Sequence, residues 1–238
     1  MQQSRFQQWF KADASQMLVV DGMEKSTCTA TASPLTYLAA LLTQTLESLP
    51  AAVPLTFFCG LHAKPEDNLE GAQGIIRCFV SQLLLQNWDF DCAFIDRNEV
   101  ERVYTHETSQ LCKLFERLLI SALNNMTIFC IIDGISWFEN NERCMNVRIV
   151  MLSLRQLVDK LQQNSRGVNL KVFVTSPKRS RSADSWSVPG DRLVMPADVG
   201  GNGQGSNVLH MTGATQRIMG SQRGNEPEQW AVGAQMAY

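Results

Sequence analysis

The sequence predicts an α/β domain built on a mainly parallel, five-stranded sheet. Short apolar runs alternate with longer segments of helical spacing, which is the pattern of repeated βαβ units. One run, Thr127–Asp133, is apolar without alternation, as expected for a strand that is covered on both faces. The chain of 238 residues is also long enough to bury a sizeable core.

Five apolar runs are the predicted strands, and the fifth is the weakest of them. Helical segments separate the first four, so each connection is long enough to join parallel neighbours. The predicted strands span residues 17–20, 55–59, 127–133, 170–175 and 192–195.

Four segments carry apolar residues at intervals of three and four, the spacing of one helix face. In the first, Ser33 is a good N-cap and Pro34 suits the first helical turn. A shorter amphipathic segment with Phe6, Trp9 and Phe10 precedes the first strand, and we expect it to cover the edge of the sheet. The apolar faces of the four helices run over residues 35–49, 75–84, 111–122 and 147–161, and the last helix is expected to end near residue 167.

The chain divides into three predicted regions. These are an N-terminal amphipathic segment over residues 1–16, an α/β domain over residues 17–197 and a tail over residues 198–238. The tail holds Gly, Asn, Gln and Ser with few large apolar residues, so it cannot bury enough surface to offset its ordering entropy, and we predict disorder. Residues 177–190 are rich in Ser and Arg and predict an exposed loop.

Composition excludes several classes of protein. The formal net charge of −2 argues against a nucleic-acid binder, which usually carries a basic excess. The seven cysteines are scattered without a CxxC pair, which disfavours a disulfide framework or zinc site and favours a reducing compartment. There is no signal peptide and no apolar stretch of the roughly 18 residues that a transmembrane helix needs. We therefore expect a cytoplasmic protein without a membrane partner.

The segment over residues 18–42 contains the parts of a phosphate-binding loop in their usual order. Gly22 follows the first strand, Lys25 and Ser26 come next, and Ser33 begins a helix. In the motif GxxxxGK[ST], backbone N–H groups and the lysine hold the phosphates, and the hydroxyl binds Mg²⁺.

The spacing of this loop departs from the motif. When Lys25 is aligned with the motif lysine, Val19 and Glu24 stand where the two glycines belong. A β-branched residue suits left-handed backbone angles poorly, and a carboxylate would repel phosphate. The connection over residues 22–33 is also too long. An ordinary surface loop with a solvated lysine is the simpler interpretation, although the helix that begins at Ser33 could still hold an anion at its N-terminus.

Asp133 is the candidate ligand for a metal ion. It ends the third predicted strand, which is where nucleoside triphosphatases place the acid that holds Mg²⁺, and Gly134 allows a sharp turn after it. A plain turn remains an equal alternative, because Asp and Gly commonly end strands. The next acid is Glu139, so no obvious base is placed to activate water.

Polar residues also end the fourth predicted strand. Thr175 and Ser176 lie at the sheet edge where open α/β proteins bind ligands. Lys178 and Arg179 follow, and they either meet a phosphate or are solvated loop charges, of which we favour the second.

The order of these features resembles a known family. The stretches that carry the resemblance, over roughly residues 5–197, are "FQQWF", "MLVVDG", "SPLTYLAALL", "LTFFCGLH", "GAQGIIRCFVSQLLL", "FCIIDGISWFE" and "KVFVTSP". In this order they look like the N-terminal NTPase domain of nephrocystin-like proteins. These are STAND-class P-loop NTPases, related to NACHT domains and abundant in filamentous fungi.

The resemblance implies a three-layer P-loop NTPase-like fold with the phosphate-loop strand central. It also implies ATP or GTP with Mg²⁺ as the ligand, used as a switch for self-association. Asp133 matches the Mg²⁺-binding acid of the Walker B strand, and Gly134 matches the glycine after it. The residues that the resemblance and the helix start place near a nucleotide are Gly22, Lys25, Ser26, Ser33, Thr175 and Ser176.

Departures from the family predict a degenerate member. The Walker A glycines are missing, Ser136 and Trp137 stand where acids are expected, and Pro177 replaces the usual arginine. No ankyrin, WD or tetratricopeptide repeats follow. We therefore expect a non-catalytic binding, scaffold or signalling module that acts through a protein partner or self-association. The alternatives are a weak or slow Mg-dependent nucleoside triphosphatase that acts as a nucleotide switch, and a gene fragment with no independent role.

Overall fold

A computed structural model describes residues 2–23, 33–86, 101, 107–121, 126–140, 143–163 and 168–195. Among the predicted site residues, Lys25 and Ser26 lie outside the described residues, as does the predicted tail over residues 198–238. Gly22, Ser33 and the site residues at the ends of the third and fourth strands lie within them.

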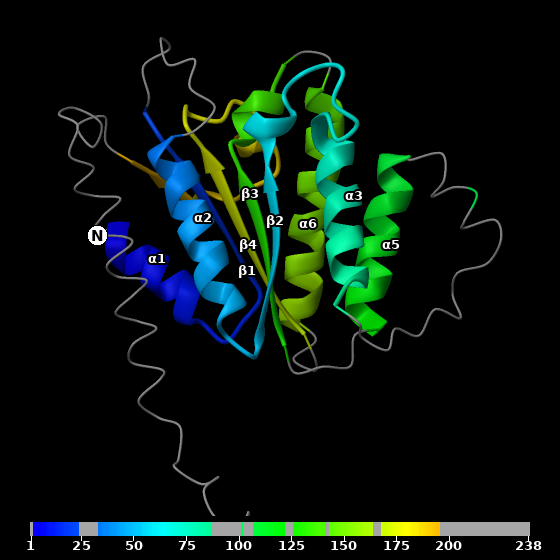
Figure 1. Cartoon of the computed structure of the whole chain (residues 1–238). Coiled ribbons are helices and arrows are strands. Elements are labelled where there is room, and N and C mark those ends of the chain that lie inside the picture. The colour runs from blue at the N-terminus through cyan, green and yellow to red at the C-terminus, as the bar shows by residue number, and fades with distance from the viewer. Residues whose placement is uncertain are drawn as a thin grey trace, which may run out of the picture.

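The described strands form one parallel five-stranded sheet, as the sequence predicts (Figure 1). Their order across the sheet is β2-β3-β4-β1-β5. The strand before the predicted phosphate loop, β1, is therefore interior but stands one place from the middle, which β4 occupies. The strands are β1 (Gln16–Asp21), β2 (Ala52–Phe58), β3 (Thr127–Asp133), β4 (Asn169–Ser176) and β5 (Arg192–Val194).

The strand positions are confirmed, with small shifts at the ends. β3 begins and ends where its unbroken apolar run predicts. β2 begins before the predicted run, because residues on both sides of Pro54 alternate between buried and half-buried. β2 is the edge strand of the sheet, and an edge strand can lack the hydrogen bond that a proline cannot donate.

Helices cover both faces of the sheet (Figure 1). α1 and α2 pack on one face, α3 and α6 pack on the other, and α5 lies against α3 and α6. Within the described residues, no helix combines the length and the apolar character that crossing a bilayer requires. The helices are α1 (Gln2–Lys11), α2 (Pro34–Glu47), α3 (Gly71–Leu84), α5 (Thr108–Ser121) and α6 (Cys144–Gln163).

The N-terminal helix lies on a face of the sheet, which corrects the expectation that it covers the edge. Phe6, Trp9 and Phe10 are buried against Phe129 of β3 and Phe173 of β4. The Trp9 and Phe173 ring centroids are 5.5 Å apart, within the range of favourable aromatic pairs. α1 therefore shares the core of the α/β domain.

The segment between β4 and β5 is more buried than its composition predicts. Lys178, Arg179 and Arg181 are exposed, as expected of a loop, but Ala183 and Trp186 are buried in the core. A single tryptophan in a Ser- and Arg-rich stretch leaves the average composition polar, which is why the prediction missed it. Single 3₁₀ turns follow the strands as η1 (Cys59–His62), η2 (Ile135–Phe138), η3 (Ala183–Ser185) and η4 (Pro189–Asp191).

Candidate functional site

The candidate site lies at the carboxyl ends of β1, β3 and β4. The helix that follows β1 packs on one face of the sheet, whereas the helix that follows β3 packs on the other. The connections that leave β1 and β3 therefore run over opposite faces, with β4 between these two strands, and open α/β sheets bind ligands where connections diverge in this way. The predicted residues Gly22, Asp133, Thr175 and Ser176 all lie at this edge.

Asp133 and Thr175 form a direct contact between β3 and β4. Asp133 is only 2% exposed, and the Thr175 Oγ1 hydroxyl donates a hydrogen bond of 2.6 Å to its Oδ1 atom. The backbone N–H of Gly134 lies 3.1 Å from the carbonyl oxygen of Thr175 and donates to its hydroxyl oxygen at the same distance. Thr175 therefore fixes the carboxyl group from the neighbouring strand.

Gly134 supplies the turn that the sequence predicts after Asp133. Its φ of 75° is left-handed, and a Cβ atom there would lie 3.0 Å from the Trp137 ring. Glycine is the residue that adopts this backbone without strain. The chain consequently leaves β3 in a tight turn and carries Glu139 towards the β4–β5 connection.

Burial raises the pKa of the Asp133 carboxyl above its ordinary value, while hydrogen bonds from Thr175 and Thr36 act in the opposite direction. Thr36 belongs to the first turn of α2, so this helix begins next to the acid. Thr36 is not among the site residues that the sequence predicts. The available signal was its position three residues after Ser33, which is the spacing of a capping box.

The N-terminus of α2 is closed by its own residues. The Ser33 hydroxyl accepts hydrogen bonds from the N–H groups of Leu35 (3.1 Å) and Thr36 (3.2 Å), and Thr36 Oγ1 accepts one from the Ser33 N–H (3.0 Å). Pro34 has no N–H, and the Tyr37 N–H donates to the Ser33 carbonyl (3.1 Å). Every backbone donor in this first turn therefore has a partner, whereas a bound phosphate needs such donors to be free.

Gly22 and Ser176 join the ends of β1 and β4. The Gly22 N–H donates a 2.6 Å hydrogen bond to the Ser176 carbonyl. A Cβ atom at Gly22 would lie 2.5 Å from the carbonyl oxygen of Pro177, so this contact between backbones requires a glycine. The Ser176 hydroxyl donates to the carbonyl oxygen of Lys178. Both predicted site residues thus have partners within the protein.

A buried ion pair that the sequence does not predict lies beside them. Asp21 is fully buried, and Arg192 of β5 donates to its Oδ2 atom from Nε (3.1 Å) and from Nη2. The Ser180 N–H donates to Asp21 Oδ1 at 3.0 Å, and Arg192 also pairs with Asp184. No short-range pattern relates residues so far apart in sequence, so the pairing was not predictable from the chain.

Glu139 anchors the β4–β5 connection. Its carboxylate accepts hydrogen bonds from the Arg181 N–H (2.8 Å), from the N–H (3.2 Å) and hydroxyl (2.6 Å) of Ser182, and from the hydroxyl of Ser180. The Ser182 hydroxyl in turn accepts a 3.0 Å hydrogen bond from the Trp186 indole. These bonds give Glu139 a structural role at the edge of the candidate site.

The oxygen atoms around Asp133 fit a Mg²⁺ site only in part. A carboxylate beside the hydroxyls of Thr36 and Thr175 offers the hard oxygen ligands that Mg²⁺ takes together with phosphate oxygens. The N–H groups of Leu35 and Thr36 at the start of α2 are engaged by the Ser33 hydroxyl and are not free to hold a phosphate. Within the described residues, no group of three or more His, Cys, Asp or Glu side chains could hold a metal ion.

Comparisons with known proteins identify the family. No curated protein and no solved structure matches the chain. The sequence profile described as nephrocystin 3, N-terminal, matches residues 1–177. The match includes α1 and the first four strands, and it covers well over half of the 238 residues. The chain therefore belongs to the nephrocystin 3 N-terminal family.

Proposed function

We propose that the protein is a non-catalytic binding, scaffold or signalling module built on a degenerate STAND/NACHT-like NTPase fold. It acts through a protein partner or through self-association. The observation that carries this proposal is the closed N-terminus of α2, where Ser33 and Thr36 cap the first turn and Pro34 removes a donor. A helix that satisfies its own N–H groups has no backbone donors left for a phosphate.

The acidic side of the site supports the same proposal. Asp133 is only 2% exposed and its Oδ1 atom accepts a hydrogen bond from Thr175, so little of the carboxyl group is accessible to a cation. Glu139, the next acid along the chain, is occupied by the backbone and hydroxyl groups of residues 180–182. A catalytic base for water would need a carboxylate that is free to accept a proton.

A weak Mg-dependent nucleoside triphosphatase is the second candidate, and the convergence of Asp133, Thr36 and Thr175 favours it. An acid and a hydroxyl at the start of the helix are the ligands that hold Mg²⁺ beside a nucleotide. Lys25 and Ser26 would then have to supply the contacts to phosphate. Bound Mg²⁺ would neutralise phosphate charge, and Asp133 would hold it.

Calorimetric titration of the full chain with Mg·ATP, Mg·ADP and Mg·GTP separates the two candidates. We expect no binding at millimolar nucleotide by a protein whose circular dichroism melt is cooperative. Nucleotide binding that disappears in Asp133→Ala would overturn the first candidate and support the second. Lys25→Ala tests whether the lysine contributes to any such binding, and Lys11→Ala is the control for removal of one positive charge.

A further inference from the structure

One side of β1 is only partly covered by its neighbour. β4 pairs with β1 along its whole length, from Gln16 to Asp21, but β5 pairs only with Val19–Asp21. No described strand lies beside residues 16–18 on the β5 side. In terms of strand pairing this half of β1 is therefore an open sheet edge, although Met17 and Leu18 are only 4% and 1% exposed. An unpaired edge is a template for another strand.

The hydrogen bonds of β1 determine which backbone groups face this opening. The Gly22 N–H bonds to β4, whereas the Asp21 carbonyl accepts a 2.8 Å hydrogen bond from Met195, at the end of β5. Backbone groups alternate between the two sides of a strand, so Val19 and Met17 face the same side as Asp21. Met17 precedes the part of β1 that pairs with β5, and its N–H and C=O therefore point into the open edge.

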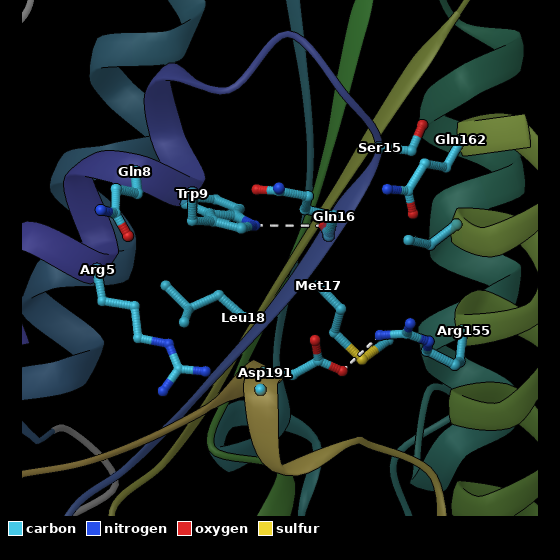
Figure 2. Close-up of a pocket in the computed structure, with 12 residues that line it drawn as sticks. Arg5, Gln8, Trp9, Ser15, Gln16, Met17, Leu18, Arg155, Gln162 and Asp191 are labelled. Atoms are coloured by element: carbon cyan, nitrogen blue, oxygen red, sulfur yellow. Dashed lines mark hydrogen bonds and ion pairs between the residues drawn. The ribbon is translucent and has the colours of Figure 1, made fainter. Parts of the chain in front are cut away.

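The open edge forms the floor of a slot with a cavity of about 290 Å³. Figure 2 shows Arg5, Gln8 and Trp9 of α1 on one side and Arg155 and Gln162 of α6 on the other. Asp191 of η4 lies at the end of the slot where β5 begins. Two helices thus flank a strand edge.

The two arginines that line the slot differ in whether a carboxylate pairs with them. Arg155 pairs with Asp159 (2.7 Å) and with Asp191, so two carboxylates accompany this guanidinium. Arg5 donates to the carbonyl oxygen of Arg192 at 2.7 Å, and no carboxylate among the described residues pairs with it. Arg5 therefore leaves a positive charge at the slot for which a ligand can supply the carboxylate.

We propose that this slot binds an extended peptide segment of a partner protein by adding it as a strand beside β1. The Met17 backbone supplies the hydrogen bonds of the ladder, and Arg5 pairs with an acidic side chain of the peptide. Because β5 leaves only about three residues of edge, roughly 10 Å of strand, the complex is weak and transient. The slot lies at the amino end of β1, away from Asp133, so this inference does not depend on nucleotide binding.

The test uses fluorescence anisotropy with the full chain and three labelled seven-residue peptides. The first is acetyl-Ser-Val-Glu-Val-Thr-Val-Ser-amide. The second has Gln in place of Glu, and the third has proline at alternate positions, which removes the N–H donors of one edge. We expect the first peptide to bind, the second to bind roughly tenfold more weakly because the charge-assisted hydrogen bond is lost, and the third not to bind.

Variants of the protein test whether the peptide binds in the slot. Arg5→Gln should lower the affinity for the first peptide roughly tenfold, so that the protein no longer prefers this peptide over the peptide with Gln. Lys11→Gln removes one positive charge from the same helix outside the slot and should leave both affinities unchanged. In the wild type, the amide resonance of Met17 should shift on titration with the first peptide. Gln8→Trp, at an exposed position that lines the slot, should block binding while the thermal melt stays cooperative.

Four results would overturn the proposal. The first is no binding at millimolar peptide, and the second is an equal loss in Arg5→Gln and Lys11→Gln. The third is binding that appears only after residues 196–238 are removed, because the chain's own tail would then be the occupant. The fourth is a concentration-dependent dimer that shifts the Met17 amide without peptide, because a second copy would then fill the slot.

Discussion

Asp133 is a carboxyl group whose ionisation opposes folding. Its folded pKa lies above the value of the unfolded chain, chiefly because it is buried. Between these two pH values the folded state binds the additional proton, so the stability that the protonated carboxyl contributes is lost as pH rises through this interval. At neutral pH the buried carboxylate is therefore a destabilising group unless a cation binds it.

Asp133→Asn should raise the melting temperature at pH 7. The amide keeps an acceptor for Thr175 and carries no charge to bury, so we expect an increase of roughly 2–4 °C, equivalent to about 1 kcal/mol in a domain of this size. The difference should disappear near pH 3. Scanning calorimetry at several pH values measures it. If Mg²⁺ and nucleotide instead stabilise the wild type more than they stabilise Asp133→Asn, then Asp133 is a metal ligand.

Lys171 is another buried ionisable residue of the sheet. It belongs to β4 and is 1% exposed, and its Nζ atom donates a 2.7 Å hydrogen bond to the carbonyl oxygen of Trp9 in the last turns of α1. Burial lowers the pKa of this lysine from 10.5 to about 8, although Asp13 acts in the opposite direction. Lys171 thus links α1 to the sheet, but burial of its positive charge lowers the stability of the folded protein.

Replacing Lys171 with Met should change how stability depends on pH. Between pH 8 and pH 10.5 the unfolded chain binds more protons at this lysine than the folded protein does. The free energy of unfolding of the wild type should therefore increase with pH relative to that of Lys171→Met. After allowance for solvent screening, the relative gain is about 2 kcal/mol. Urea unfolding across this interval measures it, with the exposed Lys11→Met as the control. Parallel curves for wild type and Lys171→Met would contradict the pKa direction.

At the scale of elements, the connection between β4 and β5 is anchored by one side chain that lies about 40 residues earlier in the chain. Glu139 follows β3 and η2, yet it accepts hydrogen bonds from residues 180–182. This contact holds a segment whose composition predicts a loop against the core. The same segment carries exposed basic side chains at Lys178, Arg179 and Arg181.

Limited proteolysis should reveal this anchoring. Trypsin needs a local extended backbone around Lys178, Arg179 or Arg181, which the bonds to Glu139 prevent. Glu139→Ala should lower the free energy of unfolding by about 2 kcal/mol, because several donors lose their acceptor. It should also accelerate cleavage at these residues severalfold. Glu116→Ala, which removes an exposed ion pair with Lys160, should leave the cleavage rate unchanged. Equal rates in all three proteins would show that the segment is anchored by other contacts.

Local signals predict elements well and contacts between elements poorly. The apolar run of β3 and the Ser33-Pro34 start of α2 are confirmed at the predicted residues, because each depends on neighbours in sequence. The buried position of Trp186 was not predicted, since it depends on Glu139 and Ser182. Composition averages over a segment, whereas burial is decided by what a single side chain meets.

At the scale of the whole molecule, the sheet includes more of the chain than the family match does. The match ends at residue 177, whereas β5 and its Arg192 lie later in the chain. Arg192 is the partner of the fully buried Asp21, and Trp186 and Leu193 complete the two cores. Residues 178–195 are therefore part of the folded domain.

Two truncations test this boundary. A chain of residues 1–195 keeps every described strand and should melt within a few degrees of the full protein. A chain of residues 1–177 leaves the Asp21 carboxylate buried without its partner, a loss of roughly 3–5 kcal/mol, and should not fold cooperatively. Circular dichroism melts measure both. Cooperative melting of the shorter chain at the temperature of the longer one would remove β5 from the domain.

The candidate site was predictable only in outline. Asp133, Thr175 and Ser176 could be placed at one edge because the carboxyl ends of parallel strands meet there. Their hydrogen-bond partners could not be placed, since the distances between β1, β4 and β5 in sequence carry no local pattern. The start of α2 was predicted in part. The sequence predicts the Ser33 cap, but only the structure shows that Thr36 completes this cap and lies beside Asp133.

The strand order also has a consequence for how the protein is made. Among the described strands β1 leaves the ribosome first, yet its two neighbours, residues 169–176 and 192–194, are the last two strands to be synthesised. Contacts so distant in sequence make folding slow, and an apolar strand that waits for them is prone to aggregation. The aromatic face of α1 and the leucine face of α2 are the nearest apolar surfaces available to it during translation. These two helices would shelter the nascent strand until β4 emerges.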